Sequence, residues 1–226
     1  GHTLRQGMDF VWHPLTSEEY RALGSLGRLR HRFEWGPFGS GAYYLRVVWW
    51  HKMVRFSAPD RWAAAARFDR MLVAAFLALS FGICLLLAGP LGLWVWFKTV
   101  VVPFLLFCQI IGWVVYVHHI DPEIRWWPRR SWNRFRGQVE GTTILLGPPG
   151  WDVFFHWIMV HLPHHVDMRI PCYRLPEAAT AIAEAFPDHA EVRRLSIRRY
   201  FRATRECKLH DFETGTWSRY RSTKPS

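Results

Sequence analysis

Two stretches in the middle of the chain are apolar and contain no charged residue: residues 71–88 and residues 99–117. At 1.5 Å of rise per residue, a helix of about 18 residues is about 27 Å long, close to the thickness of the hydrocarbon core of a membrane. One such run would also fit the core helix of a soluble protein, but two in succession favour membrane spans. Gly89 and Pro90 interrupt the pattern between them, so the pair is predicted to form a transmembrane helical hairpin.

Basic residues flank the two runs on their outer sides. Before the first run come Lys52, Arg55, Arg61, Arg67 and Arg70, and after the second come Arg125, Arg129, Arg130, Arg134 and Arg136. The connection between the runs carries only Lys98. Because short basic segments stay in the cytosol, both flanks are predicted to lie on the cytosolic side of an integral, multi-pass membrane protein.

The segments before the first run are less regular. Residues 1–40 show little hydrophobic periodicity and are interpreted as a cytosolic connector, in which His13 and His31 are expected to be exposed or lightly packed. Residues 43–55 place apolar side chains on one helical face, which predicts a helix in the lipid headgroup region. A second helix is predicted to start at Pro59-Asp60.

The segments after the second run also read as helical. Residues 177–186 are rich in alanine and predict a helix that Pro187 ends, while residues 191–226 are basic and hold His210-Asp211, expected at the surface. The whole pattern predicts an all-α membrane protein with three segments. These are a cytosolic connector with interfacial helices (1–70), a transmembrane hairpin (71–117), and a cytosolic helical region that contains a histidine box and the C-terminal segment (118–226).

Composition supports a membrane protein. The net charge of +11 would also suit a nucleic-acid binder, but 14 Trp and 16 Phe suit aromatic belts at a lipid interface and argue against nucleic acid. The mean hydropathy of −0.05 averages very apolar runs with very basic flanks. The four cysteines are widely spaced, without a Cys-x-x-Cys pair, and are interpreted as free thiols in a reducing compartment.

Histidines are most concentrated between His156 and His165, where four of the twelve fall within ten residues. His161, His164 and His165 have the spacing i, i+3, i+4, which places three imidazoles on one face of a helix. Neutral imidazole binds iron, zinc, copper and nickel. The alternative is a polar helix face with chance histidines. His156 lies about 140° from His161 around a helix, so one straight helix cannot point both the same way. Pro163 also resists a helix interior. A break is therefore predicted between His156 and His161, with the His-x-x-His-His box (His161, His164 and His165) near a helix start.

A second histidine pair, His118-His119, directly follows the second apolar run. This position is the predicted cytosolic mouth of the bilayer, where a metal centre could meet a molecule that enters from the lipid. The alternative is an interfacial pair that anchors the helix end.

The segment from His156 to Tyr173 resembles the third histidine box of membrane fatty acid desaturases, closest to the acyl-lipid omega-6/omega-3 type. An upstream His precedes His-x-x-His-His, and then come Ile170-Pro171-Cys172-Tyr173 and Leu175-Pro176-Glu177-Ala178-Ala179-Thr180. His119 followed by Asp121-Pro122 resembles a Gln-His pair and Pro of the family, with His118 in place of the Gln. The resemblance implies a di-iron centre. Its expected ligands here are His119, His156, His161, His164 and His165, and His118 is expected to support them without binding the metal.

The start of the chain resembles the segment just after the second histidine box of this family, at Thr3 and at Asp9-Phe10-Val11-Trp12. His2 would then lie just past that box and would not be a ligand. The expectation is therefore a C-terminal portion of a desaturase that lacks the first two boxes and is inactive alone. Its iron centre would be completed by upstream histidines.

The function expected from the resemblance is oxygen-dependent introduction of a double bond into an acyl lipid. The active site would face the cytosol, and cytochrome b5 or ferredoxin would supply electrons. A sister hydroxylase, ketolase or acetylenase would use the same oxidant, and a non-catalytic membrane fragment is a further alternative. A zinc hydrolase is weakly supported, since no His-Glu-x-x-His motif or candidate general base stands near the cluster.

Overall fold

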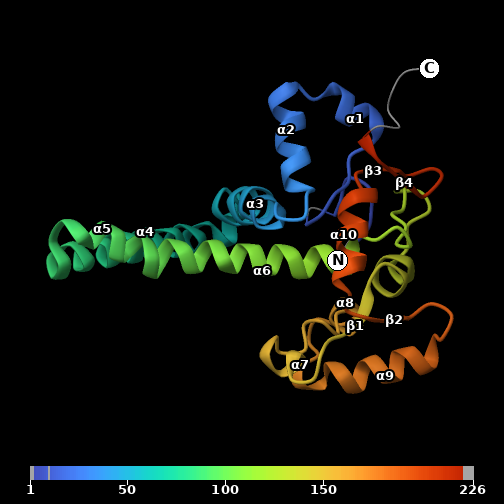
Figure 1. The fold of residues 1–226 in the computed structure, drawn as a ribbon. Coiled ribbons are helices and arrows are strands. Elements are labelled where there is room, and N and C mark those ends of the chain that lie inside the picture. The colour runs from blue at the N-terminus through green and yellow to red at the C-terminus, as the bar shows by residue number, and fades with distance from the viewer. Residues whose placement is uncertain (1–2, 10, 221–226) are drawn as a thin grey trace. The chain divides into compact units, whose positions relative to one another are not determined.

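The computed structural model describes residues 3–9 and 11–220, so His2 and Phe10 lie outside the described residues. The described chain is mostly helical, and Figure 1 shows the elements. The α-helices are α1 (Ser17–Ala22), α2 (Ser25–Glu34), α3 (Ser40–Tyr43), α4 (Asp60–Ala88), α5 (Gly92–Trp96), α6 (Val102–His119), α7 (Trp151–Phe154), α8 (Leu162–Val166), α9 (Leu175–Ala185) and α10 (Ile197–Glu206). Wider π-helical turns form η1 (Tyr44–Val54), η3 (Phe97–Val101) and η4 (Arg136–Glu140), and 3₁₀ turns form η2 (Gly89–Leu91) and η5 (Cys172–Arg174).

Short strands make the fold differ from the all-α prediction. They are β1 (Thr143–Leu146), β2 (Glu191–Arg194), β3 (Leu209–Asp211) and β4 (Thr216–Ser218). β1 pairs with β2 in parallel, with Ile144 opposite Val192, and β3 pairs with β4 in antiparallel. The β1–β2 pair joins segments almost fifty residues apart, and such pairing leaves little local signal in runs of four residues.

The chain forms two compact units: Gly1–Ser40 with Trp113–Ser226 (unit 1), and Gly41–Gly112 (unit 2). The boundaries fall after Ser40 and inside α6, whereas the sequence suggests divisions at residues 70 and 117. α6 therefore contributes its first part to unit 2 and its last two turns, from Trp113, to unit 1.

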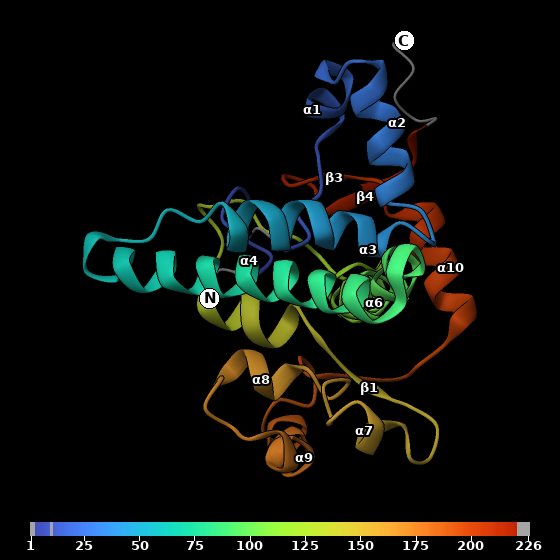
Figure 2. The same cartoon turned by 90° about the vertical axis from the view of Figure 1, so that its left-hand side faces the viewer.

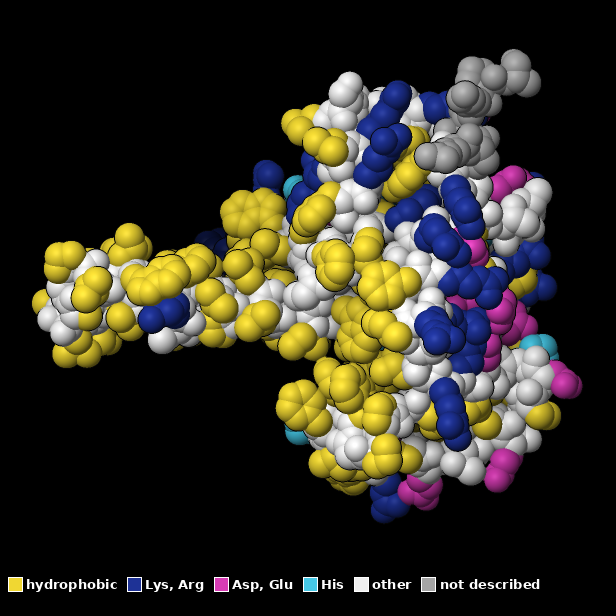
Figure 3. Space-filling view, viewed as in Figure 1, with side chains coloured by type: hydrophobic (Ala, Val, Ile, Leu, Met, Phe, Trp, Pro, Cys, Tyr) yellow, Lys and Arg dark blue, Asp and Glu magenta, His cyan; other side chains and the backbone are white. Residues whose placement is uncertain are grey.

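Unit 2 is built from long apolar helices. α4 begins after Pro59, as predicted, and none of its 29 residues is buried. The chain turns at η2, where Gly89 has a φ of 55° that favours glycine. α5 then packs on α4: the Trp96 indole N–H donates to Ser80 Oγ at 2.9 Å, and a Cβ on Gly92 would clash with the Cys84 carbonyl. Hydrophobic side chains cover these helices in Figure 3.

By length and composition, the described residues contain one candidate membrane-crossing stretch, Asp60–His119, whose most apolar window has a mean hydropathy of 2.6. The two apolar runs predicted as separate spans lie within this one stretch, because η2, α5 and η3 keep the chain helical between them. The helix predicted for residues 43–55 is confirmed as α3 and η1.

The first forty residues hold two helices that the sequence pattern did not predict. α1 starts at a capping box in which the Thr16 hydroxyl accepts from the Glu19 amide and the Glu19 carboxylate accepts from the Thr16 amide. α2 follows after two residues. The available signal was the Thr-x-x-Glu spacing, which marks a helix start even where hydrophobic periodicity is weak.

The core of unit 1 surrounds β1. Ile144 packs in a cluster with residues of α8 and α9, including Leu162, Leu175 and Ala179. The next residue, Leu145, packs in a second cluster with Val114 and Met159. Because successive strand residues point to opposite faces, β1 separates the two clusters and is buried on both sides. In Figures 1 and 2, α8 and α9 lie together beside β1, so this core fixes the position of the histidine box.

Candidate metal centre

Three histidines from two helices converge in unit 1. His119 ends α6, His161 is the N-cap of α8, and His165 lies inside α8. Each can offer one ring nitrogen to a common point, since these nitrogens all lie within 4.8 Å of one another. The closest pair is His119 Nε2 and His165 Nε2, at 3.2 Å. The ring centroids of His161 and His165 are 4.6 Å apart. We call these three residues the histidine cluster.

The predicted break upstream of the box is confirmed. α7 ends at Phe154, and the chain then turns through His156 and Trp157, which have φ values of 49° and 56°. α8 begins at Leu162 with Pro163 in its first turn, where a missing amide hydrogen costs no helical hydrogen bond. The break lets the start of α8 face His119. It leaves His156 exposed and outside the cluster, so its role as a ligand stays a prediction.

Two more predicted histidines lie at the edge of the cluster. The ring of His118 stacks on that of His161 with centroids 4.6 Å apart, and His118 is fully buried. His164 is half-buried, and its ring centroid lies 5.5 Å from that of His161. Neither belongs to the group of three whose nitrogens share one point. The roles predicted for both, support for His118 and ligation for His164, stay predictions.

Hydrogen bonds at the outer nitrogens orient the rings. His119 Nδ1 lies 3.2 Å from the Gly141 carbonyl oxygen, which requires that Nδ1 carry the proton and leaves the Nε2 lone pair facing the cluster. His165 Nδ1 lies 3.1 Å from Thr3 Oγ1, and His118 Nδ1 lies 3.2 Å from Thr143 Oγ1. The sequence did not identify Gly141 or Thr143 as partners, and no local pattern would have shown these contacts.

Burial makes the cluster a set of neutral donors. It lowers the pKa of His161 well below its usual value, and the neighbouring histidines His118 and His165 lower that pKa further. Burial likewise lowers the pKa of His165. Both rings are therefore neutral near pH 7, and a neutral imidazole is the form that binds a metal.

Two buried nitrogens indicate that the site fits a cation. In the described part of the chain, His161 Nδ1 and His118 Nε2 have no hydrogen-bond partner. A buried polar atom without a partner costs about 1–3 kcal/mol, so an orphaned nitrogen in a native core calls for an explanation. A metal ion bound by imidazole nitrogens, as iron and zinc are, would supply the missing partner for His161.

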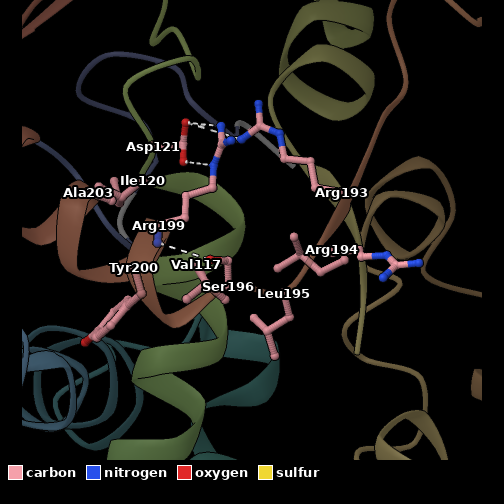
Figure 4. Close-up of a pocket in the computed structure, with 11 residues that line it drawn as sticks. Val117, Ile120, Asp121, Arg193, Arg194, Leu195, Ser196, Arg199, Tyr200 and Ala203 are labelled. Carbon is pink, nitrogen blue, oxygen red and sulfur yellow. Dashed lines mark hydrogen bonds and ion pairs between the residues drawn. The ribbon is translucent and has the colours of Figure 1, made fainter. Parts of the chain in front are cut away.

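A buried ion-pair network fixes the segment just after His119. Both carboxylate oxygens of Asp121 accept from Arg199, at 2.6 and 2.8 Å, and Asp121 also pairs with Arg193 at 3.2 Å. Figure 4 shows Arg199 turned toward Asp121. Asp121 thus ties β2 and α10 to the end of α6, two residues from His119 of the cluster. The sequence pattern marked this residue only as part of Asp-Pro.

Two histidines that the sequence placed at the surface are buried away from the cluster. His31 stacks on Trp35, with centroids 5.4 Å apart, and its Nδ1 lies 2.8 Å from the Tyr220 hydroxyl. His210 packs between Phe212 and Trp217. The expectation of exposure was wrong for both. Rings near in sequence pack on them, but their burial also needs distant segments: Tyr220 meets His31 across 189 residues, and Trp126 meets His210 across 84.

Comparison with known proteins identifies the family of this chain. The fatty acid desaturase family matches residues 1–196. The chain is 28% identical to an sn-1 oleoyl-lipid 12-desaturase of Synechocystis sp. over 95% of this chain and 60% of that protein. It is 29% identical to the enzyme of that name from Anabaena variabilis, over 95% and 61%. It is 26% identical to a chloroplastic omega-6 fatty acid desaturase of Glycine max, over 91% and 47%. The chain spans about half to three fifths of these relatives, and it belongs to the fatty acid desaturase family.

Proposed function

We propose that this chain is part of a membrane-embedded, di-iron, oxygen-dependent desaturase that introduces a double bond into the acyl chain of a lipid. The observation that carries the proposal is the cluster of three histidines from α6 and α8, in which His119 and His161 are buried and His165 is partly buried. The relatives described as oleoyl-lipid 12-desaturases and omega-6 desaturases support the reaction and the substrate class.

His119, His161 and His165 are the proposed iron ligands that the geometry supports most directly. His164 stands beside them, and His156 would need a rearrangement of the turn at His156–Trp157 to join them. When bound, two irons and oxygen supply an oxidant strong enough to remove hydrogen from an unactivated methylene. Three ligands are few for two irons, so we propose that histidines outside this sequence complete the centre.

The chain's own residues prepare the site for such chemistry. The Gly141 carbonyl and the Thr3 hydroxyl hold His119 and His165 in fixed orientations. Ile120, Met159 and Leu162 are fully buried, and Met159 and Leu162 belong to the two clusters that pack against β1. This packing keeps water away from the β1 side of the cluster, which protects a reactive oxidant from side reactions. On the other side, His165 and Thr3 line an open pocket of about 590 Å³.

We further propose that the stretch Asp60–His119 crosses the membrane twice as a hairpin, with both flanks in the cytosol. The reversal at η2 and the absence of buried residues in α4 support it. The basic flanks would also attract an acidic electron donor such as cytochrome b5 or ferredoxin. Single cysteines introduced beside Arg55 and beside Arg130 should be labelled from the same side of oriented vesicles. Labelling from opposite sides would reject the hairpin.

The activity is tested by fatty acid profiling of a host that expresses the full-length protein. His161→Ala should reduce the unsaturated product to background, because it removes a donor from a site with few ligands. His51→Ala is the matched control, since His51 is an exposed residue of η1, and it should leave the product unchanged. Normal product from His161→Ala at equal protein level would reject the metal-ligand role. A hydroxylated product from the unaltered protein would show a sister hydroxylase instead.

A further inference from the structure

The face of unit 1 that carries α10 has an open hollow of about 490 Å³ lined almost entirely by arginine. Its lining residues are Arg193, Arg194, Ser196, Arg198, Arg199 and Arg202. No acidic side chain is among these described residues. Figure 3 shows dark-blue side chains gathered on this side of the molecule, with hydrophobic side chains beside them. A concave surface of this composition is complementary to a phosphate-bearing anion.

Arg202 pairs with Glu206 at 3.1 Å, and the other four arginines of this hollow divide into two groups. Arg193 and Arg199 turn inward and are neutralised by Asp121 and Glu123. Arg194 and Arg198, by contrast, have no ion-pair partner among the described residues, and both are exposed. Figure 4 shows the Arg194 side chain directed away from Asp121. The structure is therefore held by the first group, while the second is free to bind a ligand.

Apolar side chains stand beside the free arginines on the outer face of α10. Ile197 is 64% exposed and Phe201 is 46% exposed, one turn apart on the helix. A free phosphate or nucleotide would leave these side chains in water. A phospholipid would meet both requirements, because its headgroup carries the charge and its acyl chains cover the apolar side chains.

The position of α10 also favours a lipid. Tyr200 packs on the last turns of α6, with its ring centroid 5.8 Å from that of Tyr116, and Val117 lies near it in the same part of unit 1. Val117 is the last residue of the second apolar run, so α10 lies where the proposed span leaves the bilayer. At that level, phospholipid headgroups are the most concentrated anions available.

We propose that Arg194 and Arg198, with Ile197 and Phe201, form a binding site for an anionic phospholipid headgroup at the end of α6. This site rests on the proposed membrane embedding but not on the iron chemistry. Through the Asp121–Arg199 pair, a lipid bound here would hold α10 against the segment that follows His119. The ligand class is a glycerophospholipid with a net negative headgroup.

Native mass spectrometry of the full-length protein in detergent tests the site, with phosphatidylglycerol and phosphatidylcholine as probes. The unaltered protein should retain about tenfold more phosphatidylglycerol than phosphatidylcholine, and Arg194→Gln with Arg198→Gln should remove this preference. The matched control is Arg28→Gln with Arg30→Gln, two exposed arginines of α2, which should keep it. Equal retention of both lipids, or an unchanged preference in the Arg194/Arg198 variant, would overturn the proposal.

Two further measurements identify the source of the anion. Millimolar inorganic phosphate should not displace phosphatidylglycerol, and Ile197→Ser with Phe201→Ser should weaken its retention severalfold. Displacement by phosphate would show a site for a soluble anion and overturn the lipid assignment. The lipid assignment would also be overturned if the Arg194/Arg198 variant were reduced more slowly by ferredoxin while its lipid retention stayed unchanged. That result would show a protein-docking surface. The mass readout needs neither iron nor turnover, so its failure is distinguishable from failure of the desaturase proposal.

Discussion

A soluble protein usually buries apolar side chains and exposes polar ones. α4 in unit 2 and the histidine cluster in unit 1 depart from this arrangement in opposite ways. α4 presents large apolar side chains outward along 29 residues, none of them buried. The cluster places His119 and His161 inside a packed core, beside the fully buried His118. Exposed apolar area costs about 25 cal/mol per Å² in water, and buried polar groups without partners cost about 1–3 kcal/mol each.

The proposed function accounts for both inversions with a component other than protein. The proposed bilayer would give α4 an apolar solvent. The proposed metal ion would accept the lone pairs of the cluster. Substitutions in each region test whether their stability depends on these different environments. The predictions below run from the largest expected effect to the smallest.

Asp121→Ala should destabilise unit 1 by about 3–5 kcal/mol, because it leaves the buried guanidinium of Arg193 and the bidentate site of Arg199 without their anion. Thermal unfolding of the purified protein in detergent measures this. Glu213→Ala is the matched control, since Glu213 pairs with Arg130 where both are exposed, and it should cost less than about 1 kcal/mol. Equal effects would mean that the interior of unit 1 does not depend on its buried ion pairs.

Leu79→Asp should disfavour membrane insertion of α4 by about 3 kcal/mol, because a carboxylate would lie near the middle of a span. Leu29→Asp on α2 is an equal test in unit 1: Leu79 is 66% exposed and Leu29 is 65% exposed. The second change should alter stability by no more than about 0.5 kcal/mol. Glycosylation mapping measures the insertion of α4. Protein yield in membranes and thermal unfolding compare the two variants. Equal tolerance of both changes would break the comparison, since α4 would then face water.

His31→Ala should lower the stability of unit 1 by about 2 kcal/mol, because it removes a buried ring stacked on Trp35 and a hydrogen bond to Tyr220. The iron content of the folded protein should not change, since His31 lies outside the histidine cluster. Thermal unfolding and metal analysis of the same preparation measure both. Loss of iron at unchanged stability would place His31 in the metal site and contradict its separation from the cluster.

Thr143→Val should have the smallest effect, with roughly tenfold weaker iron retention, because it removes the hydroxyl bonded to His118 Nδ1. The adjacent Thr142→Val is a sharp control: Thr142 is also buried, but in the described chain its hydroxyl has no hydrogen-bond partner. That change should be neutral or slightly stabilising. Iron retention of the full-length protein is measured by dialysis against a chelator. The same loss in both variants would show that packing, and not the hydrogen bond, supports His118.

The sequence by itself determined the features that depend on neighbouring residues. The uncharged runs predicted the helices of unit 2, Pro59-Asp60 the start of α4, and the alanine-rich segment α9. Pro163 and the spacing of the histidines predicted a chain break and a box at a helix start, as observed. These predictions succeed because helix periodicity, proline and glycine act within a few residues, whatever the rest of the chain does.

Only the tertiary structure decided which histidines meet. His119 and His165 lie 46 residues apart, and Thr3 reaches His165 across 162 residues. The structure also placed His156 outside the group of three, buried His31 and His210 elsewhere, and paired β1 with β2. Such contacts depend on the free energy of packing the whole core, in which many distant segments compete for the same burial. No short segment of sequence records the outcome of that competition.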